Sequence, residues 1–220
     1  MVYEIELHGI MFYFNCLERM DRAVQKLLCC LDDIPVEKIR DGYTFRVNFT
    51  RYVLTKNNTG YYVAATDYSD PDPMTAFTLD LTDALEIEIM QSMLCDEFGV
   101  DRYDISDETM VGVYPDALTS PHVTIFNVAI DDKRCVRAIV KIDEYDDSRL
   151  VDFAEIGESV YIPAGKLYKY NKLLVYGLSI PPDYTFVIKN NKVDSMVNDK
   201  NEVIKYTWRE GMDYDPDGWM

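Results

Sequence analysis

The sequence predicts an α+β protein in which an N-terminal β-α-β-β-α-β half is followed by a predominantly antiparallel β half. Three observations support this class. Charged and apolar residues alternate over Val2–His8, as in a strand with one buried face. Apolar residues then recur at threes and fours as far as Leu31, which is typical of an amphipathic helix. From His122 onward, short β-branched and aromatic runs follow one another between polar turns.

The first helix is expected after the apolar run Ile10–Phe14. Asn15 is a residue type that caps helix N-termini, so we place the start of the helix there. The predicted apolar face consists of Leu17, Met20, Val24, Leu27, Leu28 and Leu31. Asp32–Pro35 should end the helix, because the residue before a proline disfavours helical backbone.

A hairpin is expected next. Its strands are Tyr43–Thr55 and Tyr61–Asp67, joined by Lys56–Gly60, whose Asn and Gly residues tolerate positive φ. After the Pro- and Asp-rich loop Asp67–Pro73, the segment 76–98 fits both a strand and a helix pattern.

We interpret this ambiguous segment as a short strand followed by a helix from about Thr82, with Gly99 just beyond the helix end. Thr109–Tyr114 is apolar enough for a further strand. The resulting order of elements resembles a ferredoxin-like split βαβ arrangement.

The second half is predicted to consist of strands separated by turns at Pro181-Pro182 and Asn190–Lys192. The expected strands are His122–Ile130, Cys135–Ile142, Val160–Ile162, Leu173–Ile180, Tyr184–Ile188 and Val203–Trp208. A boundary near Ser120-Pro121 would divide the chain into an acidic α+β domain, 1–120, and an antiparallel β domain, 121–220. The alternative is that the two halves share one core.

Composition and cysteine usage indicate a cytoplasmic protein. The first fourteen residues contain Glu4 and Glu6 and do not read as a secretion signal, and no run of 18 apolar residues predicts a membrane span. The five cysteines form no CxxC pair, which favours reduced thiols over a disulfide framework.

The acidity of the chain is local. Residues 61–120 hold fourteen acidic side chains and one base, Arg102, so this stretch has a net charge of −13 out of −17 for the whole chain. We call it the acidic block. If all its carboxylates shared one surface, they would match the charge of about 22 Å of duplex DNA, which carries one charge per roughly 1.7 Å.

This clustering predicts a non-enzymatic interaction protein. An acidic surface of this kind mimics nucleic acid and blocks a basic protein that normally binds DNA or RNA, as phage inhibitors of bacterial defence nucleases (the anti-CRISPR and anti-restriction classes) do. Tyrosines within the block would supply the flat contacts that bases otherwise make. The predicted partner-binding residues are Asp67, Asp70, Asp72, Glu86, Glu88, Asp101, Tyr103, Asp104, Asp107 and Glu108.

Two other functions use the same residues. A divalent-metal-dependent enzyme would use Asp101, Asp104, Asp107 and Glu108, which would share a face if they were helical. An immunity or scaffold protein would present the acidic surface to a basic toxin or another basic partner. At the C-terminus, Asp213–Gly218 repeats the first six positions of a calcium loop but lacks the glutamate at position twelve.

No catalytic signature stands out. His122 opens one half of an H-x-T phosphoesterase pattern whose other half is missing, and Cys29, Cys30 and Cys135 are expected to pack in the core. The glycines form no phosphate-binding loop. Lys166–Lys172 is basic with interleaved aromatics, as in single-strand nucleic-acid surfaces, but the acidic block would repel that ligand. We therefore expect no cofactor, no bound metal, no direct nucleic-acid binding and no membrane contact.

Overall fold

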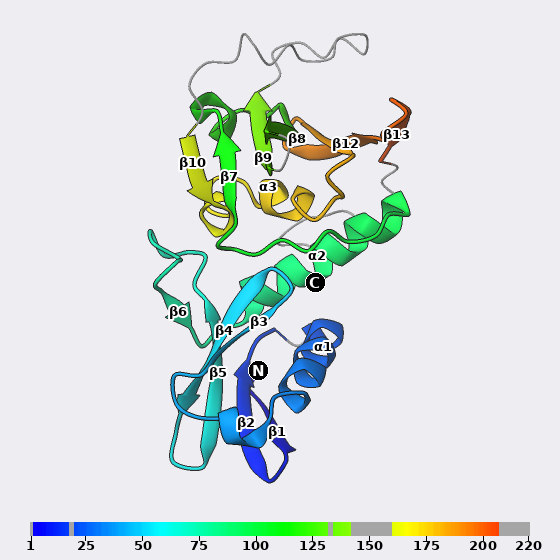
Figure 1. Ribbon diagram of the computed structural model, residues 1–220. Coiled ribbons are helices and arrows are strands. Elements are labelled where there is room, and N and C mark those ends of the chain that lie inside the picture. The colour runs from blue at the N-terminus through cyan, green and yellow to red at the C-terminus, as the bar shows by residue number, and fades with distance from the viewer. Residues whose placement is uncertain (1, 18–19, 132–133, 142–159, 207–220) are drawn as a thin grey trace.

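The computed structural model describes residues 2–17, 20–131, 134–141 and 160–206, and the structural statements below concern those residues. Their strands form two mixed sheets, with a long helix running between them (Figure 1). The helices are α1 (Asp21–Asp32), α2 (Thr82–Phe98) and α3 (Lys172–Gly177), with short 3-10 turns η2 (Val36–Lys38), η3 (Pro115–Leu118) and η5 (Ala164–Leu167).

The first sheet has the strand order β1-β2-β5-β4-β3, with β6 beside β5. Its strands are β1 (Val2–Leu7), β2 (Ile10–Asn15), β3 (Thr44–Val47), β4 (Thr50–Lys56), β5 (Gly60–Thr66) and β6 (Phe77–Thr78). The β2–β5 pair is parallel and the other named pairs are antiparallel. Phe12 and Phe14 on β2, and Tyr52 and Leu54 on β4, are buried at alternating positions, so one face of this sheet lies against the core.

The second sheet has the order β10-β7-β9-β8-β11-β12-β13. Its strands are β7 (Met110–Val113), β8 (Val123–Asp131), β9 (Arg134–Lys141), β10 (Val160–Pro163), β11 (Thr185–Lys189), β12 (Lys192–Val197) and β13 (Val203–Lys205). The β7–β9 pair is parallel and the remaining pairs are antiparallel. The predicted α+β class, with a largely antiparallel second half, is therefore confirmed.

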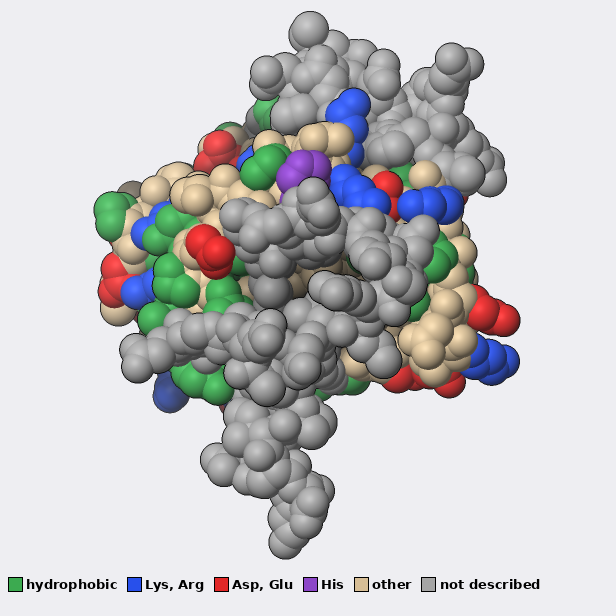
Figure 2. Space-filling model, turned by 90° about the horizontal axis from the view of Figure 1, so that it is seen from above, with side chains coloured by type: hydrophobic (Ala, Val, Ile, Leu, Met, Phe, Trp, Pro, Cys, Tyr) green, Lys and Arg blue, Asp and Glu red, His purple; other side chains and the backbone are tan. Residues whose placement is uncertain are grey.

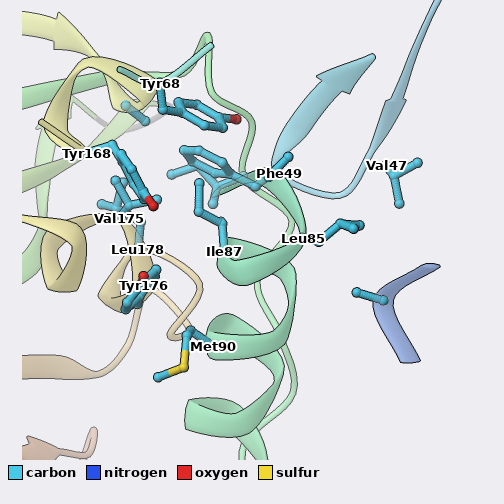
Figure 3. Close-up of a cluster of buried hydrophobic side chains, with 14 of the residues drawn as sticks. Val47, Phe49, Tyr68, Leu85, Ile87, Met90, Tyr168, Val175, Tyr176 and Leu178 are labelled. Carbon is cyan, nitrogen blue, oxygen red and sulfur yellow. The ribbon is translucent and has the colours of Figure 1, made fainter. Parts of the chain in front are cut away.

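Helix α2 joins the two sheets into one core. A single cluster of buried side chains contains residues of both sheets and of all three helices. Leu85 points toward Val47 of the first sheet, Ile87 lies beside Phe49, and Met90 lies on the opposite side of α2 from Val47, toward Tyr176 of α3 (Figure 3). Because α2 is covered on two sides, its buried positions follow no single stripe, which explains why its sequence fitted two patterns.

Two expectations about the first half are wrong in detail. Asn15 is the last residue of β2 rather than a helix cap, and α1 begins at Asp21. Ile10–Asn15 forms a strand because His8 and Gly9 both adopt positive φ and reverse the chain into a tight hairpin with β1.

The second detail concerns Tyr43–Thr55, which is two strands rather than one. The chain turns at Asn48, whose φ of 48° lies in the left-handed region, and β3 and β4 pair across that turn. The expected short strand, the helix start at Thr82 and Gly99 in the left-handed conformation beyond the helix end are confirmed.

The ferredoxin-like pairing is not found. The strand after α2, β7, pairs with β9 and β10 of the second sheet instead of returning to the first. Strand β7 thus belongs to the second sheet although it lies before the predicted domain boundary at Ser120-Pro121. The cluster of buried side chains is also continuous across both sheets. The division into domains at Ser120-Pro121 stays a prediction.

In the second half, Leu173–Ile180 was predicted as a strand, but Lys172–Gly177 is helix α3. The side chain of Asn171 accepts a hydrogen bond from the Leu173 N–H and so caps the helix start. An apolar run that is buried on all sides shows neither the helix nor the strand period of hydrophobic residues. The N-cap residue Asn171 was therefore the feature of the sequence that indicated a helix. Strand β12 was not predicted; it follows the tight turn at Asn190 and Asn191, both with positive φ.

Candidate functional site: where the acidic block lies

The acidic block spans the loop after β5, helix α2 and the loop that leads to β7. Four circumstances separate its carboxylates: pairing with the basic segment of the second half, burial, pairing with arginines of the first sheet, and exposure without an ion pair. In the view from above, the acidic side chains of the described residues are scattered among other side chains, including lysines and arginines (Figure 2).

The basic segment Lys166–Lys172 is an internal partner of the acidic block. Lys166 Nζ lies 2.9 Å from Asp72 Oδ1, and Lys172 Nζ lies 3.2 Å from Glu86 Oε2. Tyr176 also donates a hydrogen bond of 2.6 Å to Glu86, which is half-buried. These contacts attach α2 and the loop before it to η5 and α3, so two charge features that looked like separate external sites neutralise each other.

Glu88 lies in the interior of the protein, on the face of α2 that meets the first sheet. Its carboxylate forms ion pairs with Lys26 of α1 and with Arg102, whose Nη1 lies 2.7 Å away. Asn48 donates a further hydrogen bond of 2.8 Å. Burial, together with the Glu88 charge, raises the pKa of the Tyr52 hydroxyl beside this network. Glu88 is therefore a structural anchor and is not available to a partner.

Asp107 is also buried, with 1% of its surface exposed. Thr66 Oγ1 donates to its Oδ2 at 2.8 Å, while the other carboxylate oxygen, Oδ1, has no hydrogen-bond partner among the described residues. Burial raises the pKa of the Asp107 carboxyl, and the Thr66 hydrogen bond and the Arg51 charge only partly offset this effect. The predicted role of Asp107 in contacting a partner conflicts with its position inside the protein.

Asp104 and Glu108 are exposed but paired with arginines of the first sheet. Arg46 Nη2 lies 3.1 Å from Asp104 Oδ2, and Arg51 Nη1 lies 2.8 Å from Glu108 Oε1. These residues do not share a helical face with Asp101 and Asp107, because the segment 101–109 is irregular rather than helical. Within the described parts of the chain, no three His, Cys, Asp or Glu side chains are arranged to hold a metal ion.

Three predicted partner-binding carboxylates, those of Asp67, Asp70 and Asp101, carry no ion pair between described residues. Asp67 and Asp70 lie in the loop after β5, where their carboxylates accept hydrogen bonds from the backbone N–H groups of Ser69 and Asp72. Asp101 and Tyr103 are exposed in the loop after α2. The backbone N–H of Tyr103 donates to Ser179 O at 2.8 Å, which holds this loop against the second half.

Two exposed residues, Asp96 and Glu97, join Asp101 although sequence reasoning did not single them out. They lie in the last turn of α2, which contains no basic residue. We call Asp96, Glu97 and Asp101 the acidic end of α2. Among described residues, none of the three carboxylates forms an ion pair or accepts a hydrogen bond. The signal was present in the sequence: two acids stand just before Gly99 with no Lys, Arg or His nearby in the last turn.

Arg102 does not neutralise this acidic end. Its guanidinium turns toward α2, where it pairs with Glu88 and donates to the side-chain oxygen of Gln91. The only base in the sequence of the acidic block is thus used in the interior network.

The other candidate residues whose side chains the structure describes, His122, Cys29 and Cys30, have ordinary structural positions. His122 lies in a turn, where its backbone N–H donates to Ser120 Oγ. Cys29 is exposed on α1, contrary to the expected core position, and Cys30 is half-buried. Cys135 lies on β9, and the calcium-like pattern Asp213–Gly218 lies outside the described residues.

Comparison with known proteins adds no relative. None of the described helices combines the length and apolar character needed to cross a membrane. No protein-family model matches the chain, and no curated protein or solved structure matches it either.

Proposed function

We propose that this protein is a non-enzymatic binding protein that uses the acidic end of α2 to occupy a basic, nucleic-acid-binding surface of a cytoplasmic partner. The observation that carries this proposal is the set of three exposed carboxylates, Asp96, Glu97 and Asp101, at the C-terminal end of a 17-residue helix, where none of them has an ion-pair partner among the described residues. Elsewhere in the acidic block, most carboxylates are paired within the fold or buried.

The position of these acids is unfavourable for the isolated protein. The C-terminus of a helix carries partial negative charge from its unpaired carbonyl groups, so cations are stabilising there and anions are not. Each misplaced charge costs about 0.3–1 kcal/mol at low salt. These acids do not stabilise the fold, whereas a basic partner would offset their unfavourable interaction with the helix dipole. This favours partner binding over solubility as the reason for the cluster.

Tyr103 adds a contact surface to this site. Its side chain is 40% exposed and follows Asp101 by two residues. A tyrosine presents a flat apolar ring with a polar tip, and such rings are enriched at interfaces. The combination of carboxylates and an exposed ring is what a basic groove meets when it binds a nucleotide.

The extent of the mimicry is smaller than the total charge suggests. Asp72, Asp83, Glu86, Glu88, Asp104 and Glu108 have cationic partners inside the protein, and Asp107 is buried. Three neighbouring charges correspond to about 5 Å of duplex. We therefore propose a local contact with the site of a few phosphates, as a nuclease inhibitor or an immunity protein would make, rather than imitation of a long duplex.

The test compares two triple variants of equal charge. In D96N/E97Q/D101N the acidic end of α2 is neutralised, and in E37Q/D183N/D199N three exposed acids elsewhere are neutralised. Each immobilised protein is exposed to nuclease-treated lysate at 50 mM NaCl, and captured proteins are eluted with a duplex DNA oligonucleotide and identified.

We expect the wild-type protein and the control variant to retain a DNA-binding protein that duplex DNA releases. The acidic-end variant should retain about tenfold less, since three charge contacts contribute roughly 0.2–1 kcal/mol each. Equal retention by both variants, or the absence of any protein that DNA releases, would overturn the proposal. Capture of a basic toxin that DNA does not release would identify the immunity function instead.

A further inference from the structure

Asp107 occupies the point where the first sheet, the loop before β7 and η5 meet. Its backbone N–H donates to Phe49 O at 2.9 Å, and its backbone carbonyl accepts from the Gly165 N–H at 2.8 Å. Its side chain accepts from Thr66 at the end of β5. One residue thus connects the first sheet to η5, which directly follows β10 of the second sheet. We call Asp107, Phe49, Thr66 and Gly165 the Asp107 junction.

The junction is closely packed. A Cβ atom at position 165 would lie 3.2 Å from the Cβ of Asp107, 3.0 Å from Met74 and 3.3 Å from Tyr68. Glycine permits this approach of η5, so the backbone of the second half lies directly against the buried carboxyl group.

The carboxyl group is incompletely satisfied when it is ionised. A carboxylate has about four acceptor positions. Here the group accepts from the Thr66 hydroxyl and from the Arg51 backbone, while its Oδ1 has no hydrogen-bond partner among the described residues. The charge of Arg51 compensates only in part and its guanidinium does not bond to the carboxyl group, because Nη1 and Nη2 are directed to Glu108 and to Met74 O. Its buried Nε has no hydrogen-bond partner in the described structure.

Apart from Arg51, the titratable groups near Asp107 oppose its ionisation. Glu108, next along the chain, and Tyr68, from the loop after β5, are acidic groups, and a charge on either opposes a charge on Asp107. From η5 the contact is the Gly165 N–H. Arg51 is therefore the one cation among the groups that act on Asp107 in the described residues, and Glu108 already takes its Nη1.

We infer that Asp107 is a pH-dependent latch between the two sheets, closed when its carboxyl group is neutral and loosened when the group ionises. The direction follows from the buried position, which raises the pKa of Asp107 above its ordinary value of 3.8. In the open junction the group regains its ordinary pKa. The closed form therefore binds more protons than the open form between the ordinary and the raised value, and its stability falls as pH rises through that window.

The experiment measures hydrogen exchange across the junction in the full chain. Exchange of the peptides that contain Asp107 and Gly165 is followed from pH 4 to pH 8 and corrected for the intrinsic dependence of exchange on pH. The variants are D107N, which keeps an acceptor for Thr66 but cannot ionise, and D104N, which removes an exposed carboxylate of the same loop.

In the wild type and in D104N, the opening constant should increase with pH by up to about tenfold per unit within the window. In D107N it should be independent of pH, and peptides of α1 should not differ among the three proteins. The same pH dependence in D107N and the wild type would overturn the inference.

A second variant covers the case in which D107N fails to fold. T66V removes the hydroxyl that stabilises the ionised carboxylate, so it should raise the pKa of Asp107 in the closed junction further. The loss of protection should then continue to higher pH and be larger in total than in the wild type. An unchanged or weaker pH dependence in T66V would equally contradict the latch. This experiment uses the protein without a partner, so its outcome neither supports nor contradicts the proposed function.

Discussion

At the scale of single residues, burial decides what each carboxylate does. Glu88 and Asp96 are both acids on α2, yet Glu88 is 7% exposed and holds two cations, whereas Asp96 is exposed without an ion pair among described residues. A buried charge is tolerated only when it is paired and hydrogen-bonded. The network around Glu88 meets this condition because α1, the loop after α2 and the turn at Asn48 each contribute one partner, namely Lys26, Arg102 and Asn48.

This pairing predicts a large effect of one conservative substitution. E88Q keeps the shape but leaves Lys26 and Arg102 without their anion, and we expect the free energy of unfolding to fall by about 2–3 kcal/mol. That figure lies below the 3–5 kcal/mol typical of a fully buried pair because the Lys26 side chain is 45% exposed. Urea denaturation measures the change.

D104N serves as the control for E88Q. The Arg46–Asp104 pair is exposed on both sides, so its loss should change the unfolding free energy by no more than about 0.5 kcal/mol. Equal effects of E88Q and D104N would contradict the assignment of Glu88 as a structural anchor.

At the scale of elements, α2 combines two electrostatic characters. Toward its N-terminus, Asp83 and Glu86 face Lys172 of α3, which attaches the helix to the second half. Its last turn holds Asp96 and Glu97 with no base. The carboxylates near the N-terminus of α2 thus have a cationic partner within the fold. The carboxylates in its last turn lie at the negative end of the helix dipole, which is unfavourable for them.

The dipole predicts that a cation at the end of α2 stabilises the protein. D96K should raise the free energy of unfolding by about 0.3–1 kcal/mol at low salt, and the gain should shrink as salt is added. The same substitution in η3, D116K, is not at the end of an α-helix and should change stability less. A loss of stability in D96K would show that the dipole does not govern this site, while the proposed function requires D96K to bind its partner more weakly.

At the scale of the whole molecule, internal pairing leaves a surplus of negative charge. The net charge is −17 at pH 7, and the basic segment of the second half is already used against the acidic block. Self-repulsion of this kind destabilises the compact state. It is screened when the Debye length falls from about 30 Å at 0.01 M salt to about 10 Å at 0.1 M.

We therefore expect added NaCl to stabilise the protein. Between 10 mM and 300 mM NaCl the thermal midpoint should rise by about 2–4 °C, which corresponds to about 1 kcal/mol for a chain of this size. The rise should be smaller in D96N/E97Q/D101N than in the equally charged control E37Q/D183N/D199N, because the repulsion is concentrated at the end of α2. A midpoint that falls with salt would mean that the internal ion pairs outweigh the surplus charge.

Local patterns in the sequence were sufficient for the fold class and for most elements. Alternation identified β1, Gly99 marked the end of α2, and the concentration of charge in residues 61–120 was visible without a structure. These features depend on neighbours a few residues away. The helix α3 was not recognised because a short run buried on all sides has no period, although Asn171 was available as a cap.

Only the tertiary structure decided which carboxylates of the described residues are paired or buried and which are exposed. Lys166 reaches Asp72, Lys172 reaches Glu86, and Arg46 reaches Asp104, across sequence separations that no local pattern encodes. The sequence by itself determined how much negative charge the chain carries and where along the chain it lies. The fold determined how that charge is divided, because pairing and burial depend on which segments pack together, and it left the acidic end of α2 exposed.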